Sequence, residues 1–180
     1  MRSRREPVNL KLVIEYDGKN YCGWQRQAAG SKQKTIQQTI EESLQVLFKG
    51  EKINLVGAGR TDAGVHAIGQ AANFKISKEC FRKTNFAKTL VSLNAILPID
   101  IAVKKLSRAA PDFHARYSAK SRIYRYYFCF DKKAVNGGKY HRIKTDFNID
   151  LAEKFCKLLV GIHSFKRLCK NKTDDHDFLS

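Results

Sequence analysis

The sequence predicts an α+β fold in which a mostly antiparallel sheet carries helices on one face. Two stretches, at 9–17 and 69–76, alternate apolar and polar residues with the period of two that marks half-buried strands. Two others, near 35–50 and 84–95, repeat apolar residues every three or four positions, as amphipathic helices do. Strands with one apolar face need a cover, so we expect the helices in one layer and the sheet in the other.

The first strand and the first helix have clear boundaries in the sequence. The strand 9–17, NLKLVIEYD, is broken at Asp17-Gly18, and a polar loop with four basic residues follows at 18–34. Thr35 and Gln38 fit a T-x-x-Q capping box, and the helix that they begin ends near Gly50. The residues expected to face the core are Leu10, Leu12, Ile14 and Tyr16 in the strand and Ile36, Ile40, Leu44 and Leu47 in the helix.

The remaining elements continue the mixed pattern. Residues 52–58 predict a strand, and 69–76, GQAANFKI, place Gln70, Ala72, Phe74 and Ile76 on one face of another. A second helix is expected over about 84–95, then a short strand at 101–106 and a last helix at 149–160. No internal repeat or linker divides the chain.

The charge balance points to a polyanionic partner. The chain holds 34 Lys and Arg against 17 Asp and Glu, a net charge of +17, which favours nucleic acid first and an anionic membrane second. No apolar run reaches the length of a bilayer span, and the N-terminus lacks the apolar region of a signal peptide. Five scattered cysteines without a C-x-x-C pair predict free thiols in a reducing, cytoplasmic compartment rather than a zinc site.

The stretch 116–144 combines basic and aromatic residues and contains a single acid, Asp131. Within it, 119–130 alternates, so a strand would put Lys120, Arg122, Tyr124, Tyr126, Phe128 and Phe130 on one face. Guanidinium groups and rings side by side are typical of an RNA-binding surface. We expect Phe128 and Phe130 to belong to the core instead, with Lys120 and Arg122 available to RNA.

A glycine-rich motif, GAGRTDAGVHA, occupies 57–67. It resembles a phosphate-binding loop but fits neither common template. The dinucleotide fingerprint needs a glycine where Asp62 stands, and the Walker motif needs Lys-Ser/Thr where Val65-His66 stand. What remains is a tight turn of small residues that presents a carboxylate next to Arg60, whose charge favours the ionised form. Such a turn is often only structural, but it can also present a nucleophile or an acid–base group.

Residues 59–67, GRTDAGVHA, resemble the signature of the tRNA pseudouridine synthase A family. Further segments resemble family motifs in the same order: KLVIEYDGKNYCGWQRQ (11–27), GQAANF (69–74), SLNAILPIDIAV (92–103), FHARYSAKSRIYRY (113–126) and GIHSFKRLCK (161–170). The resemblance covers nearly the whole chain and stops before the family's C-terminal segment. It implies the pseudouridine synthase fold, with an RRM-like or ferredoxin-like first domain at 1–110 and a truncated second α+β domain at 111–180.

The resemblance also implies a reaction and its residues. Family members isomerise uridine to pseudouridine in the anticodon arm of tRNA, without cofactor or metal, and act as homodimers. Asp62 matches the catalytic aspartate, either as the nucleophile at C1′ or as a base on the ribose. Arg60 would hold the flipped nucleotide. Tyr124 matches a tyrosine that packs against the target base, and Arg116 a basic residue near the same site.

Other residues receive weaker or no roles. Gln25 and Arg26 lie in a loop that could contact RNA. His66 is expected to be structural, and Cys22 and Trp24 to shape their loop. The other histidines, His114, His141, His163 and His176, lack ligand spacing.

Two alternatives to an enzyme remain open: a non-catalytic RNA-binding module, and a basic assembly protein in which Asp62 is incidental. Because the resemblance stops early, we expect weak RNA binding and little activity from these 180 residues alone.

Overall fold

The computed structural model describes residues 6–27, 33–135, 139–165 and 167. It divides into two compact units, Met1–Ile123 and Tyr124–Ser180. The predicted boundary at residue 110 stays a prediction. Residues 171–180, with His176, and Cys169 lie outside the described residues, as does part of the 161–170 segment.

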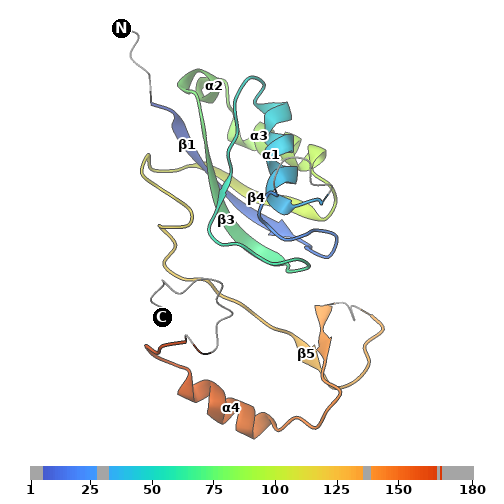
Figure 1. Ribbon diagram of the computed structural model, residues 1–180. Coiled ribbons are helices and arrows are strands. Elements are labelled where there is room, and N and C mark those ends of the chain that lie inside the picture. Colours follow the sequence, from blue (N-terminus) through green and yellow to red (C-terminus); the bar gives the residue numbers. More distant parts are fainter. Residues whose placement is uncertain (1–5, 28–32, 136–138, 166, 168–180) are drawn as a thin grey trace. The chain divides into compact units, whose positions relative to one another are not determined.

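The first unit is built on a four-stranded antiparallel sheet (Figure 1). Its strands are β1 (Val8–Tyr16), β2 (Val56–Gly57), β3 (Ala67–Ile76) and β4 (Ile101–Arg108), and they lie in the order β2-β3-β1-β4. With one helix after β1 and another after β3, this order is that of the ferredoxin-like βαββαβ arrangement. The predicted α+β class and the antiparallel sheet are therefore confirmed.

Two helices, α1 (Ile36–Leu47) and α3 (Phe86–Ile96), cover one face of this sheet (Figure 1). Each begins at a residue that accepts a hydrogen bond from a backbone N–H of the first turn, Thr35 for α1 and Asn85 for α3. The predicted capping box is only half formed, since the Gln38 side chain donates to Glu42 (2.8 Å).

The core lies between the helices and the sheet, as the apolar patterns predicted. Its fully buried side chains come from alternate positions of β1 and β3, from one stripe of α1 and from α3. They include Leu10, Leu12, Ile14, Ile36, Ile40, Leu44, Phe74, Ile76 and Leu93. Gln70, predicted to share the inner face of β3, lies at the edge of this core and is partly buried.

On the opposite face of the sheet, two buried asparagines hold the segment that follows β4. Asn9 Nδ2 donates to the carbonyls of Ala110 (2.9 Å) and Phe113 (2.8 Å). Asn73 accepts from the N–H of Ala115 (2.8 Å) and donates to Asn9 Oδ1 (3.0 Å). Residues 109–118 are thus fixed to the sheet by side chains, a connection that no sequence pattern indicated.

Several predicted boundaries differ from the structure. The strand expected at 52–58 is reduced to β2, because only Val56 and Gly57 pair with β3. The second helix begins at Phe86, and a short helix, α2 (Lys78–Arg82), precedes it unpredicted. Its five residues are too few to show a helical period.

The second unit corrects two predictions. Its described elements are β5 (Phe128–Cys129), paired in parallel with β6 (His141–Arg142), and α4 (Ile149–Leu158). The long strand predicted at 119–130 is wrong, because within the described residues only 128 and 129 find a partner strand. Phe128 and Phe130, expected in the core, are 46% and 43% exposed and pack on each other and on Phe147.

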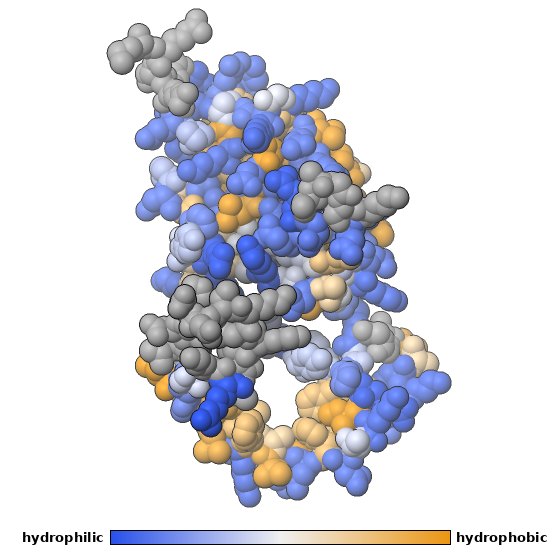
Figure 2. Space-filling model, in the orientation of Figure 1, coloured by the Kyte–Doolittle hydropathy of each residue, from blue (hydrophilic) through white to orange (hydrophobic). Residues whose placement is uncertain are grey.

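Apolar side chains of α4 and its surroundings are exposed (Figure 2). No residue in the described part of this second unit is buried, so α4 covers no core among these residues. The described cysteines, Cys22, Cys80, Cys129 and Cys156, are free thiols. Within the described residues, no helix has the length and apolar character needed to cross a membrane.

Candidate active site

The glycine-rich motif forms the loop between β2 and β3, with Asp62 exposed near its tip. The N–H of Val65 donates to the carbonyl of Asp62 (3.2 Å) and closes a four-residue turn. Gly64 is the third residue of this turn and has φ +78°, a conformation that favours glycine. The carboxylate therefore projects from a tight turn whose shape depends on the residues around it.

One side of this loop rests on the segment that follows β1. The N–H of Trp24 donates to the carbonyl of Thr61 (2.9 Å), and the N–H of Gly64 donates to the carbonyl of Tyr21 (3.3 Å). The hydroxyls of Tyr16 and Thr61 lie 2.9 Å apart. These bonds hold the residues on both sides of Asp62.

Gly23 allows this close approach. Its φ is +91°, and a Cβ added to it would lie 2.5 Å from the carbonyl oxygen of Thr61. Both the backbone conformation and the missing side chain are therefore needed at this position. Trp24 is buried beside it, as expected for a residue that shapes the loop, whereas the Cys22 side chain is exposed.

The far end of the loop contacts the turn after β1 through His66. Its Nδ1 lies 3.0 Å from Asp17 Oδ1 and 3.3 Å from the N–H of Gly18. The N–H of Gly18 donates a hydrogen bond to Nδ1, so the contact between Nδ1 and the Asp17 carboxylate is one of proximity and not a second hydrogen bond. The position of His66 agrees with its predicted structural role.

Asp62 and Arg60 are both exposed and do not pair. Within the described part of the chain, neither side chain makes a hydrogen bond or an ion pair. Any help that Arg60 gives the carboxylate is thus not a direct salt bridge. The Asp62 carboxylate is left open to an incoming group.

Gln25 and Arg26, predicted to contact RNA, take part in a network of polar contacts with buried residues of α1. Arg26 forms an ion pair with the buried Glu41 (3.0 Å), and Gln25 donates to the buried Gln37 (2.9 Å). Glu41 also accepts from the N–H of Leu55 (2.8 Å), just before β2. Within the described residues, Glu41 Oε2 accepts no hydrogen bond, and its charge is balanced by the ion pair with Arg26. In the sequence, Gln37 and Glu41 lie beside the apolar stripe of α1, and this position was the only indication that they would be buried and bonded.

The other predicted site residues fall into two groups. Arg116, Lys120 and Arg122 are exposed and belong to the first unit; Arg122 donates to the carbonyls of Ala58 and Arg116. Tyr124 belongs to the second unit, where its side chain is 71% exposed.

Tyr21 stabilises the turn after β1 that His66 contacts. Its hydroxyl donates to Asp100 (2.6 Å), and the carbonyl of Asp100 accepts from the N–H of Asp17 (2.9 Å). Burial raises the pKa of Tyr21 well above its usual range, and the bond to the Asp100 carboxylate raises it further. Tyr21 is therefore a neutral, fixed anchor for the turn that contacts the loop.

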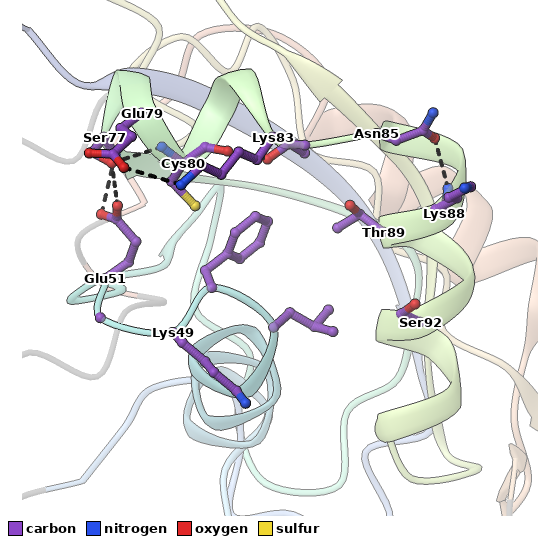
Figure 3. Close-up of a pocket in the computed structure, with 14 residues that line it drawn as sticks. Lys49, Glu51, Ser77, Glu79, Cys80, Lys83, Asn85, Lys88, Thr89 and Ser92 are labelled. Carbon is purple, nitrogen blue, oxygen red and sulfur yellow. Dashed lines mark hydrogen bonds and ion pairs between the residues drawn. The ribbon is translucent and has the colours of Figure 1, made fainter.

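A separate hollow of 580 Å³ lies between the end of α1, α2 and α3 (Figure 3). Its charged groups are mostly paired with neighbours: Glu51 accepts from Ser77, and Lys83 pairs with Glu79 (3.1 Å). Burial raises the pKa of the Cys80 thiol in its wall, which disfavours the reactive thiolate. None of the predicted site residues lines this hollow.

Comparison with known proteins points to the same family as the resemblance of the glycine-rich motif. A family described as tRNA pseudouridine synthase matches residues 12–118. A protein from Thermodesulfovibrio yellowstonii named tRNA pseudouridine synthase A is 49% identical over 95% of this chain and 67% of its own length. Relatives of the same name from Caldicellulosiruptor bescii and Caldicellulosiruptor saccharolyticus are 42% and 38% identical over 89% and 92% of this chain. The chain spans 64% and 66% of the length of these two relatives, just under two thirds.

Proposed function

The chain belongs to the tRNA pseudouridine synthase family, and on this premise we propose that it isomerises uridine to pseudouridine in tRNA, with Asp62 as the catalytic carboxylate. The observation that carries the proposal is the position of Asp62. Its side chain is exposed and unpaired within the described residues, while the backbone on both sides of it is held by Trp24 and Tyr21. A fixed backbone with an accessible carboxylate is the arrangement that a positioned nucleophile or base requires.

The atom balance of the reaction suits a site with a single carboxylate. Uridine and pseudouridine are isomers: the C1′–N1 bond breaks, the uracil turns, and C5 bonds to C1′. The proton lost from C5 is balanced by the one gained at N1, so nothing is supplied or released. Asp62 either attacks C1′ or takes a proton from the ribose to give a glycal. Both roles need an ionised carboxylate that the sugar can reach.

The substrate proposal is the anticodon arm of tRNA, with the target uridine flipped out of its stack. The net charge of +17 supports binding to the phosphate backbone. Arg60 and Arg116 bind the flipped nucleotide, and Tyr124 packs on its base. A homodimer in the cytoplasm is part of the same proposal.

Incubation with unmodified tRNA tests the function. With protein in excess over tRNA, a single turnover is detectable even when the rate is low. We expect new pseudouridines at anticodon-arm positions, with the mass of the tRNA unchanged. Binding without any conversion would contradict the proposal and favour an RNA-binding module.

A tRNA containing 5-fluorouridine separates the enzyme from a basic assembly protein. The enzyme acts on the uracil ring and should retain the substituted tRNA more strongly than the unmodified one. A protein that contacts only the phosphate backbone would retain both equally.

A further inference from the structure

Two consecutive carbonyls at the base of the Asp62 loop are held by side chains. The carbonyl of Ala58 accepts from Nε (3.0 Å) and Nη2 (2.7 Å) of Arg122. The carbonyl of Gly59 accepts from Nε2 of Gln70 (2.6 Å). These carbonyls immediately precede Arg60, so the loop leaves β2 in a direction that Arg122 and Gln70 determine.

Arg122 also holds the segment that carries Arg116. Its Nη2 donates to the carbonyl of Arg116 (3.1 Å). The preceding residues of that segment are fixed to the sheet by Asn9 and Asn73. One guanidinium group therefore joins the base of the loop to a second fixed segment within the first unit.

The donors of Arg122 are largely committed to these carbonyls. A guanidinium group has five N–H donors in a planar fork, and here Nε–H and the two hydrogens of Nη2 are directed at backbone oxygens. A lysine carries the same charge but cannot supply this fork. The geometry differs from that of an arginine whose donors are all free for phosphate.

We propose that Arg122 is a positioning residue, which fixes the Asp62 loop relative to the Arg116 segment, rather than a contact to the tRNA backbone. The proposal rests on the function proposed above. In this role Arg122 affects the rate of the chemical step through the placement of Asp62, and leaves the affinity for tRNA almost unchanged.

Single-turnover kinetics with excess protein separate rate from affinity. The variants are Arg122→Ala and Arg122→Lys, with Arg82→Ala as a control that removes an exposed arginine of α2. We expect both Arg122 variants to lower the maximal rate by about tenfold or more, with the half-saturating concentration changed by less than about threefold. The control keeps both values. A near-normal maximal rate for Arg122→Lys would overturn the positioning role.

The salt dependence of tRNA binding gives a second criterion. Loss of a phosphate contact lowers the slope of log Kd against log salt by about one, whereas loss of a positioning residue keeps the slope. A reduced slope in Arg122→Ala, with the maximal rate maintained, would identify Arg122 as a backbone contact and refute the proposal.

Hydrogen exchange tests the position of the loop without catalysis. We expect the amide of Ala58, which donates to the carbonyl of Ala71 (2.8 Å), to exchange about tenfold faster in both Arg122 variants than in Arg82→Ala. Equal exchange in all three proteins would refute the proposal. If the wild-type chain forms no pseudouridine, the proposed function fails, and the exchange result still decides the role of Arg122.

Discussion

Gly23→Ala tests whether the segment after β1 positions the Asp62 loop. The added Cβ would lie 2.5 Å from the carbonyl oxygen of Thr61, whereas ordinary contact begins at 3.4 Å, so one backbone must retreat by about 0.9 Å. A retreat of that size along the bond from Trp24 N–H to Thr61 would lengthen it from 2.9 Å to about 3.8 Å, beyond hydrogen-bond range. The loop would therefore be displaced at Thr61, the residue that directly precedes Asp62.

The expected cost has two parts. A non-glycine residue at φ +91° costs about 1–2 kcal/mol, and the overlap with the Thr61 carbonyl adds about 1–3 kcal/mol. Gly50→Ala is the matched control, because Gly50 has φ +84° and nothing within 4 Å of an added Cβ. Both variants share the backbone strain and the effect of alanine on the unfolded chain. Their difference therefore isolates the contact with the loop.

Urea unfolding and single-turnover kinetics are the assays. We expect Gly23→Ala to lower the free energy of unfolding by about 2–5 kcal/mol and Gly50→Ala by about 1–2 kcal/mol. In protein that remains folded, Gly23→Ala should also lower the rate of pseudouridine formation, and Gly50→Ala should not. Equal destabilisation by the two substitutions would refute the close approach of Gly23 to the loop.

Two further substitutions test the supports around the loop. Tyr21→Phe removes the bond to Asp100 and should cost about 1–2 kcal/mol of unfolding free energy at neutral pH. Because the pKa of Tyr21 is raised on folding, its contribution to stability is full below the unfolded pKa of about 10 and is progressively lost as pH rises above it. The free energies of unfolding of wild type and Tyr21→Phe, measured in urea from pH 8 to 11, should therefore converge. A constant difference between them would contradict the raised pKa. Glu41→Gln should cost about 1–3 kcal/mol, because Glu41 is buried and binds Arg26 and the N–H of Leu55. The exposed Glu42→Gln should change stability by less than about 0.5 kcal/mol, and similar losses in the two variants would count against the network.

Most of the first unit could be predicted from local patterns. The alternation in β1 and β3 and the stripe of α1 identify residues that are buried in the structure, because a half-buried element repeats with its own geometry. The same rule failed at 119–130. Alternation indicates which side chains would share a face, but a strand also needs a neighbouring strand for its backbone bonds, and only Phe128 and Cys129 have one within the described residues.

The loop could be located from its sequence, but its supports could not. Asp62 stands out in a run of glycines and alanines. Gly23 and Thr61, or Arg122 and Ala58, are far apart in the chain and meet only when the sheet has formed. The side chains of Gln25 and Arg26 look like free polar groups in the sequence, whereas the buried Gln37 and Glu41 bind them in the fold.

The most direct test of the account is pseudouridine formation by Asp62→Asn under single-turnover conditions, with tRNA binding measured in parallel. Asp112→Asn serves as the control, since Asp112 is an exposed aspartate outside the loop. We expect Asp62→Asn to lose at least about a thousandfold in rate while binding tRNA as well as the wild type, and Asp112→Asn to keep both. Conversion by Asp62→Asn at a rate near that of the wild type would contradict the central claim that the loop exists to present this carboxylate.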